Sequence, residues 1–321
     1  MDRILSQKMN CPICHHEQDI VQPLVSVYAT KHPLFVSCRL VSCVSCKSSW
    51  VSNPPDVQSL KKYYDVGVYG DNTFLRFLKK PDMTLERCQA LARWNFVRNA
   101  LKNLSHDFTQ TTFSVCDIGA GFGCTYEVGQ HQNLSINYFA FESSSIMRKR
   151  ILSLGGEARG DFFQYEPSKQ FDLVWASHIL EHYPDPDDLL KKMQCMIKPR
   201  GAGLIEIPCL DYEFKEELAP HLLFFTVIGL KMALERNGFK VLRADTVGCL
   251  RRQAVLRFQT RAQRPSLGKK LKKVLMKEKN IKEDLDNRSI FERWNLEVYG
   301  GERSWIRAVF TPKSPYIESP K

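Results

Sequence analysis

The stretch Val115-Cys-Asp-Ile-Gly-Ala-Gly-Phe-Gly123 decides the fold of this chain. Val115–Ile118 is a short apolar strand, and the glycines after it occupy alternate positions of a turn, namely Gly119, Gly121 and Gly123. Without Cβ atoms the backbone can adopt positive φ and press against a ligand. A second apolar strand ends on Glu142, nineteen residues after the last glycine. A carboxylate there is placed to accept both hydroxyls of a ribose, so the stretch predicts a nucleotide-binding α/β turn.

The spacing of the glycines separates this turn from the dinucleotide fingerprint. That fingerprint is G-x-G-x-x-G, and here the third glycine comes one residue early. Asp117-x-Gly-x-Gly-x-Gly123 instead resembles motif I of the class I S-adenosylmethionine-dependent methyltransferases. The resemblance implies S-adenosylmethionine as cofactor. It implies that the cofactor-binding residues are Asp117, Gly119, Gly121, Gly123, Glu142, Asp161, Phe162 and Ser177, with Asp161 on the adenine amino group and Phe162 beside the base.

Apolar strands alternate with helical patterns from residue 111 to about 260, which is typical of a mainly parallel α/β sheet. The expected strands are Phe113–Ile118, Tyr138–Phe141, Gly156–Arg159, Phe171–Ala176, Gly203–Ile207, Lys240–Asp245 and Gln253–Gln259. The expected helices are Asp82–Lys102, Asp187–Ile197 after the cap Asp185-Pro186, and Thr226–Asn237 before Gly238; Pro199-Arg200-Gly201 is expected to turn into the next strand. Seven strands match the Rossmann-like methyltransferase sheet, whose last strand usually inserts antiparallel.

The segment Phe171–His182 resembles motif IV of the branch that includes ubiquinone-biosynthesis and glycan-cluster methyltransferases. Within it His178, Glu181 and His182 share one helical face, just beyond the carboxyl end of the fourth strand, where sheets of this type open their active sites. His178 or His182 is therefore a candidate base for an acceptor hydroxyl, with Glu181 orienting it. His221 lies where family members often contact substrate, and it is the third catalytic candidate. An ordered structural turn, or a divalent-metal site built from His178, Glu181 and His182, remains open as an alternative.

Two C-x-x-C knuckles precede this region. Cys11-Pro-Ile-Cys14 and Cys43-Val-Ser-Cys46 are separated by twenty-eight residues, which leaves room for a strand pair. Four thiolates delivered from two tight turns predict structural Zn²⁺ bound by Cys11, Cys14, Cys43 and Cys46. Many ribbons have glycine directly after the second cysteine of each knuckle, and here His15 and Lys47 stand there. Cys38, His15 and His16 are spare ligand candidates.

A zinc ribbon followed by this catalytic fold resembles sugar-nucleotide methyltransferases. Those sugar C-methyltransferases usually continue into a large C-terminal domain that this chain lacks, so O-methylation of a sugar or related metabolite is the expected chemistry. The expected organisation is a zinc ribbon over residues 1–55, a helical connector over 56–110, the methyltransferase domain over 111–260 and a basic C-terminal extension over 261–321.

Composition limits compartment and partners. The apolar fraction of 43% is ordinary for a globular protein, and neither a signal-like run nor a membrane-spanning stretch is present, so a cytoplasmic location is expected. The net charge is +11, and Lys269-Lys-Leu-Lys-Lys273, continued to Lys282, is its densest block. A solvated basic helix explains this block, and contact with nucleic acid or an anionic membrane surface is the alternative.

These observations predict an enzyme that methylates a small-molecule, glycan or sugar-nucleotide acceptor at oxygen. An RNA methyltransferase is the first alternative, because ribbons also accompany this catalytic fold in that class and the chain is basic. A zinc-ribbon adaptor that has lost catalysis is the second alternative. The intact Asp117, glycine turn and Glu142 argue against it.

Overall fold

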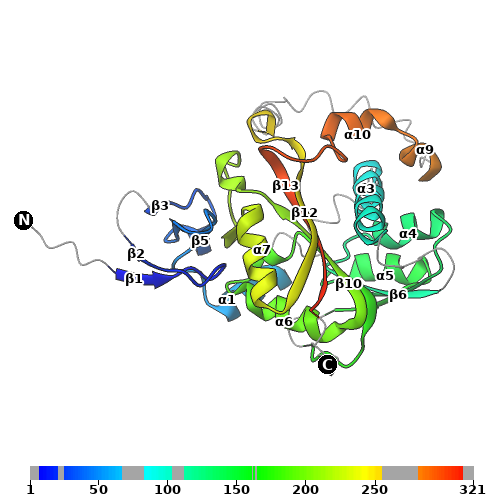
Figure 1. Cartoon of the computed structure of the whole chain (residues 1–321), viewed down its shortest axis with the longest axis horizontal. Helices are drawn as coiled ribbons and strands as arrows, with labels where there is room; N and C mark the ends of the chain where they lie inside the picture. Colours follow the sequence, from blue (N-terminus) through cyan, green and yellow to red (C-terminus); the bar gives the residue numbers. More distant parts are fainter. Residues whose placement is uncertain are drawn as a thin grey trace, which may run out of the picture.

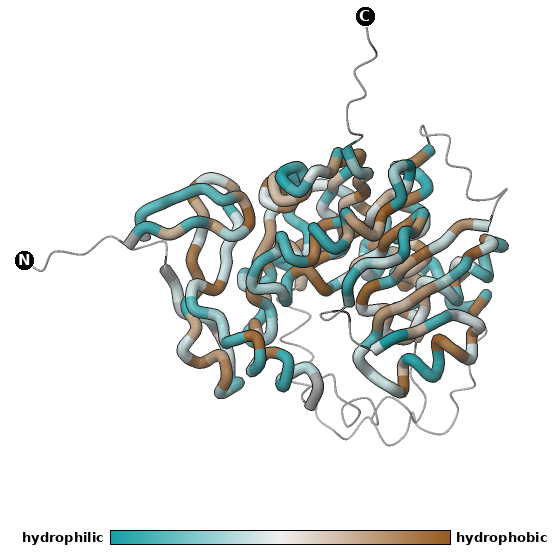
Figure 2. Tube along the Cα trace, turned by 90° about the horizontal axis from the view of Figure 1, so that it is seen from below, coloured by the Kyte–Doolittle hydropathy of each residue, from teal (hydrophilic) through white to brown (hydrophobic). Residues whose placement is uncertain are grey.

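The computed structural model describes residues 7–20, 25–66, 83–102, 112–160, 162, 165–254 and 281–313. The chain forms a seven-stranded sheet flanked by helices, and a smaller N-terminal unit of short strands lies at one end (Figure 1). In the view of Figure 2 this unit stands as a lobe beside the larger body. No helix in the described ranges is both long enough and apolar enough to cross a membrane.

The large sheet has the strand order β12-β13-β10-β9-β6-β7-β8. Its strands are β6 (Phe113–Ile118), β7 (Ile136–Phe141), β8 (Glu157–Arg159), β9 (Phe171–Ser177), β10 (Ile197–Pro208), β12 (Phe239–Leu250) and β13 (Arg303–Pro312). β8, β7, β6, β9 and β10 pair in parallel, while β13 is antiparallel to both β10 and β12. This is the mixed sheet expected for a methyltransferase fold.

The seventh strand is formed by a different segment of the chain from the one expected. The prediction of a strand at Gln253–Gln259 is wrong at its start, because residues 251–254 are helical; residues 255–259 lie outside the described part. Arg303–Pro312 occupies the antiparallel position instead, and it comes from the range expected to be a C-terminal extension. The expected turn at Pro199-Arg200-Gly201 lies within the long strand β10, where the pairing with β9 shifts register between Ile197 and Ala202.

Helices cover both faces of the sheet. They are α3 (Thr84–Leu101), α4 (Cys124–His131), α5 (Ser145–Ser153), α6 (Pro186–Met196), α7 (Val227–Arg236), α9 (Ile281–Leu285) and α10 (Arg288–Trp294). The predicted caps are present: the Asp185 side chain accepts from the Asp187 N–H before α6, Thr226 accepts from Gly229 before α7, and Gly238 takes φ +78° after it.

Alternate strand residues enter two separate cores, as the two-residue period of a strand requires. Cys116 and Ile118 pack toward α6 and α7, whereas Val115 packs toward α3 and α4 on the opposite face. Because both faces are buried, the central strands are apolar almost throughout.

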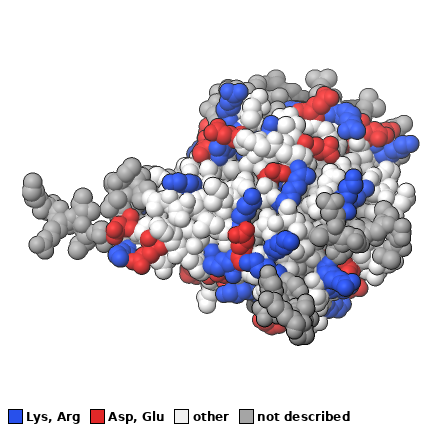
Figure 3. Space-filling model, in the orientation of Figure 1, with Lys and Arg blue, Asp and Glu red and all other residues white. Residues whose placement is uncertain are grey.

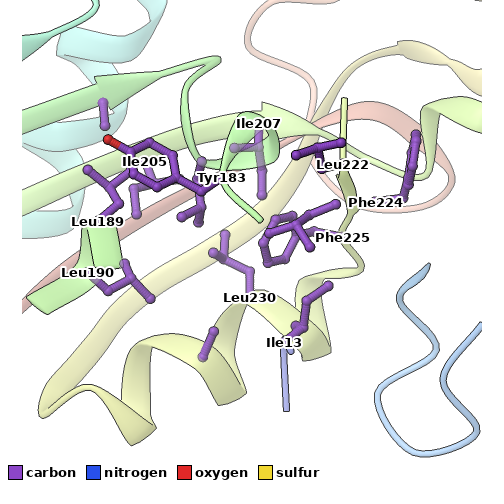
Figure 4. Packing of buried hydrophobic residues seen from close by; sticks show 14 of the residues in the cluster. Ile13, Tyr183, Leu189, Leu190, Ile205, Ile207, Leu222, Phe224, Phe225 and Leu230 are labelled. Atoms are coloured by element: carbon purple, nitrogen blue, oxygen red, sulfur yellow. The ribbon is translucent and has the colours of Figure 1, made fainter. Parts of the chain in front are cut away.

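The N-terminal unit continues the first of these cores. Its elements are β1 (Gln7–Asn10), β2 (Glu17–Ile20), β3 (Val25–Val27), β4 (Arg39–Ser42), β5 (Ser49–Val51), the short helix η1 (Pro33–Phe35) and α1 (Val57–Val66). β5 pairs with β11 (Leu223–Phe224) of the larger body. Figure 4 shows Ile13 directed toward Leu230 of α7, and both are fully buried. The two units therefore pack as one body.

Candidate active site

The glycine turn joins β6 to α4 at the carboxyl edge of the sheet. Gly119, Gly121 and Gly123 have φ values of +72°, +55° and +71°, which only glycine adopts without strain. The Gly119 N–H donates to the Phe141 carbonyl at 2.8 Å, so the turn is tied to the end of β7. A Cβ on Gly119 would meet Ile179 Cδ1 at 2.2 Å, whereas one on Gly121 would meet nothing within 4 Å. The turn is thus packed at its base and open at Gly121.

Glu142 follows β7 and faces this turn. Its carboxylate accepts the N–H groups of Gly121 and Ser144, each at 2.8 Å. The residue is 9% exposed, and this burial raises the pKa of the carboxyl despite the two hydrogen bonds. Glu142 therefore lies beside the glycine turn, directly after the end of the neighbouring strand β7.

Asp117 lies inside the sheet, one residue before the end of β6. Its carboxylate accepts a hydrogen bond of 2.7 Å from the Tyr138 hydroxyl. Burial raises the pKa of Asp117 to about 6, while Tyr138 and Thr125 oppose the shift. Asp117 therefore supports the turn from beneath rather than at its surface.

Of the three remaining residues predicted to bind the cofactor, the structure describes two. Phe162 packs edge-on against Phe141, with ring centroids 4.9 Å apart, at the end of β7. The Ser177 hydroxyl, at the end of β9, is buried and has no hydrogen-bond partner among the described residues. Asp161 lies outside the described residues.

His178 follows β9 in a left-handed conformation with φ +57°. Its N–H donates to the Glu206 carbonyl at 2.7 Å, which turns the chain away from the sheet. Its Nδ1 lies 3.4 Å from the Glu181 carboxylate and its Nε2 lies 3.5 Å from the Glu206 carboxylate. Partial burial opposes the charged imidazole, but the two carboxylates outweigh it and raise the pKa of His178.

Glu206 is a site residue that sequence reasoning missed. It is fully buried in β10, where Arg93 of α3 donates to it at 2.6 and 2.8 Å and Arg307 of β13 pairs with its second oxygen. The two guanidinium groups hold the pKa of Glu206 well below its usual range, against the effect of burial. A carboxylate inside the apolar run Gly203–Pro208 was the signal that could have indicated it.

Glu181 and His182 form one turn of 3-10 helix, η2 (Leu180–His182), and His178 stands outside that turn. The three residues therefore do not share a helix face as predicted, although His178 still reaches Glu181. Burial acts to raise the pKa of Glu181, but the histidines around it lower that pKa. Burial lowers the pKa of His182 to about 4, so its imidazole is neutral at pH 7.

His221 joins this turn from a distant segment. The Leu222 N–H donates to the Glu181 carbonyl at 2.7 Å, and the His182 and His221 rings lie 4.9 Å apart. His221 Nδ1 is 2.8 Å from the carboxylate of Asp211, which is fully buried and also contacts Lys215 at 2.6 Å. Burial acts to raise the pKa of Asp211, but His221 and Lys215 lower it. Sequence reasoning missed Asp211.

The four knuckle cysteines converge into one cluster. Their sulfur atoms all lie within 4.8 Å of one another, with Cys11–Cys46 at 3.9 Å and Cys14–Cys43 at 3.5 Å. His15 and Lys47 adopt φ values of +62° and +59°, so both non-glycine residues take the conformation for which ribbons prefer glycine.

The spare ligand candidates lie outside this cluster. Cys38 donates to the Asn53 carbonyl, and His15 Nε2 is 3.5 Å from Asp187 of α6. His16 is exposed.

On the face that Figure 3 shows, the described basic residues do not gather into one patch. Figure 3 shows Lys and Arg interspersed with Asp and Glu over the described part of the visible surface. Residues 269–280 of the basic block lie outside the described residues, so contact with nucleic acid or an anionic membrane stays a prediction.

Comparison with known proteins gives a family and a set of similar folds. Residues 78–244, just over half of the chain, match the family described as methyltransferase domain. No curated protein sequence matches the chain.

Two solved proteins illustrate the similar folds. Phosphoethanolamine N-methyltransferase 2 of Haemonchus contortus, in complex with S-adenosyl-L-methionine, is 15% identical with a TM-score of 0.48, covering 82% of this chain and 62% of that one. In a second complex of that enzyme the chain spans about half, 52%, of its length, with 16% identity, 68% of this chain covered and a TM-score of 0.45. An S-adenosylmethionine-dependent methyltransferase of Thermotoga maritima is 15% identical with a TM-score of 0.43, covering 78% of this chain and 99% of that one.

Proposed function

The chain belongs to the methyltransferase domain family, and on that premise we propose that it transfers a methyl group from S-adenosylmethionine to an oxygen of a small-molecule or glycan acceptor. The observation that carries the proposal is the open glycine turn facing a buried carboxylate. A Cβ on Gly121 would enter empty space, and the Gly121 N–H already points to Glu142.

The residues at this edge fit the cofactor. Glu142 would hold the ribose hydroxyls, because a buried carboxylate accepts strong, directed hydrogen bonds. Phe162 would cover the adenine, and Gly121 would let the backbone approach the ligand closely. When bound, S-adenosylmethionine supplies an electrophilic methyl group on its sulfonium.

His178 is the residue best placed to hold the proton of an acceptor hydroxyl. Its side chain is 35% exposed, whereas those of His182 and His221 are each 11% exposed. Carboxylates lie near both of its ring nitrogens, which would stabilise the imidazolium formed when the hydroxyl loses its proton. The contact between Gly119 and Ile179 places the segment after His178 directly beside the glycine turn.

We propose further that the N-terminal unit is a zinc ribbon. In a tetrahedron with Zn–S bonds of about 2.3 Å the sulfur atoms stand about 3.8 Å apart. The separations of 3.9 and 3.5 Å in the cysteine cluster agree with that geometry. All four ligands are cysteines, so the zinc would be structural and would leave no position for water.

Calorimetric titration with S-adenosylmethionine tests the cofactor. The wild-type chain should bind, and Glu142→Gln should bind about 10- to 100-fold more weakly, since hydrogen bonds to a charged group contribute about 1.5–3 kcal/mol. Glu157→Gln, which removes an exposed carboxylate on β8, is the matched control and should bind as wild type. Absence of binding by the wild-type chain would overturn the enzyme proposal and favour the adaptor.

Incubation with labelled cofactor identifies the acceptor. Separate fractions of metabolites, glycans and RNA are supplied, and label in the first or second supports the proposal. Label only in RNA, with binding that weakens steeply with salt, would instead establish the RNA methyltransferase. His178→Gln should reduce transfer while leaving cofactor affinity within about twofold of wild type.

A further inference from the structure

A buried cluster is formed by Glu181, His182 and His221. The proposed methyl transfer assigns no role to its two histidines. One ligand-type atom from each of the three lies within 4.8 Å of the other two. Glu181 and His182 come from η2, and His221 comes from the segment before β11. The hydrogen bond from the Leu222 N–H to the Glu181 carbonyl fixes the two segments against each other.

The Glu181 carboxylate is unsatisfied in this setting. The residue is 1% exposed, and neither oxygen accepts a hydrogen bond from the described residues. The nearest groups that can carry positive charge are His178 Nδ1 at 3.4 Å and His182 Nε2 at 4.0 Å. A buried carboxylate without hydrogen bonds costs several kcal/mol, and among the described residues only imidazole groups stand near this one, so a cation bound beside Glu181 would be stabilised.

Asp211 orients His221 toward the cluster. Its carboxylate lies 2.8 Å from His221 Nδ1, so Nε2 is the ring nitrogen that would bind the metal. Histidines that bind metal usually donate their other ring N–H to a carboxylate or carbonyl, and this partner fixes the ring orientation. Tyr28 of the N-terminal unit donates to the His221 carbonyl at 2.9 Å and holds the same residue from the backbone side.

We propose that Glu181, His182 and His221 bind a divalent first-row transition metal ion, with Asp211 supporting His221. Two imidazoles and one carboxylate form a donor set that suits Zn²⁺ and its neighbours and leaves an open coordination position. With bonds of about 2.1 Å, two ligands of a tetrahedral ion stand about 3.4 Å apart. The ligand atoms here lie within 4.8 Å of one another, so binding would draw them together by up to about 1.4 Å.

Equilibrium dialysis of the full chain, purified with its zinc, against Co²⁺ tests the proposal. Mass spectrometry of the metals should give one zinc and one cobalt per chain. The visible spectrum should show cobalt bands without a thiolate charge-transfer band, which separates this site from the cysteine cluster. The assay contains no cofactor, so its outcome is independent of the methyltransferase proposal.

Variants assign the ligands. Glu181→Gln and His221→Gln should each lose the cobalt and retain the zinc, which also reports that the chain is folded. Asp211→Asn should bind cobalt about 10- to 100-fold more weakly, as expected for a residue that supports a ligand. His16→Gln, which removes an exposed histidine, should bind cobalt as wild type.

Two results would overturn the proposal. One is a wild-type chain that takes up cobalt only with a thiolate charge-transfer band or not at all. The other is retention of the second metal by both Glu181→Gln and His221→Gln. If one of these variants loses its zinc as well, the remaining variant and the wild-type spectrum decide the outcome.

Discussion

Alanine at Gly119 and at Gly121 should affect this protein differently, although both glycines have positive φ and stand two residues apart in one turn. At Gly121 the new Cβ meets nothing within 4 Å, so only the left-handed backbone opposes it. At Gly119 the Cβ would lie 2.2 Å from Ile179 Cδ1 and 2.8 Å from Ile179 Cγ1. The Ile179 side chain must therefore leave its position.

The magnitudes follow from these contacts. A left-handed alanine costs about 1–2 kcal/mol, so Gly121→Ala should lower the free energy of unfolding by about that amount. Overpacking adds about 1–3 kcal/mol, so Gly119→Ala should lower it by about 2–5 kcal/mol. Urea denaturation followed by tryptophan fluorescence measures both values, since Trp94 and Trp175 are buried against each other beside the central strands.

A second substitution tests whether Ile179 is the cause. In the background of Ile179→Ala the added cost of Gly119→Ala should fall to that of Gly121→Ala, giving a coupling energy of about 1–3 kcal/mol. Cofactor affinity should follow the opposite order, because only Gly121→Ala places a methyl group in the open space; a weakening of at least about tenfold is expected there. Equal destabilisation by the two alanines, or no rescue by Ile179→Ala, would refute this reasoning.

Three further predictions follow from other parts of the fold. Cys46→Ser should lose about one equivalent of zinc and unfold at a lower temperature, whereas Cys38→Ser, outside the cluster, should keep the metal; metal analysis and thermal melting distinguish them. Because burial raises the pKa of Asp117 to about 6, against an unfolded value of about 3.9, the native state binds this proton more tightly and loses stability as pH rises between the two values. Urea denaturation should show that the free energy of unfolding of the wild type falls by about 2–3 kcal/mol between pH 4 and 7, relative to that of Asp117→Asn. Equal pH dependence of the two proteins would contradict the raised pKa of Asp117. Glu206→Gln leaves the Arg93 and Arg307 charges uncompensated and should lower the free energy of unfolding by about 3–5 kcal/mol, while Glu157→Gln should change it by less than about 0.5 kcal/mol in the same denaturation experiment.

Several elements could be predicted because their determinants are close together in the sequence. The run Phe113–Ile118 is bounded by a glycine turn, and the strand has those limits in the structure. Asp185-Pro186 and Thr226 predicted helix starts, and their side chains make the expected capping hydrogen bonds. Local hydrogen bonds and steric limits on φ decide such features, so a few neighbouring residues suffice to predict them.

The cysteine cluster was predictable for a similar reason. Each knuckle is a tight turn of four residues, and the only long-range requirement is that the two turns meet. Left-handed backbone at His15 and Lys47 was not predicted, because few non-glycine residues adopt it. The turn hydrogen bonds from the N–H groups of His15 and Lys47 to the Cys11 and Cys43 carbonyls accompany that conformation.

The sequence by itself therefore determined the glycine turn, the alternation of strands and helices, and the paired knuckles. Only the tertiary structure decided that Arg303–Pro312 is the seventh strand and that Glu206 lies between two arginines from distant elements. It also decided that the residue that joins Glu181 and His182 in one cluster is His221, beside Asp211, and not His178 as expected. The physical reason is that strand insertion and buried charge pairing depend on which distant segments come together in space. That choice is set by the burial and charge balance of the whole molecule, and no local spacing records it.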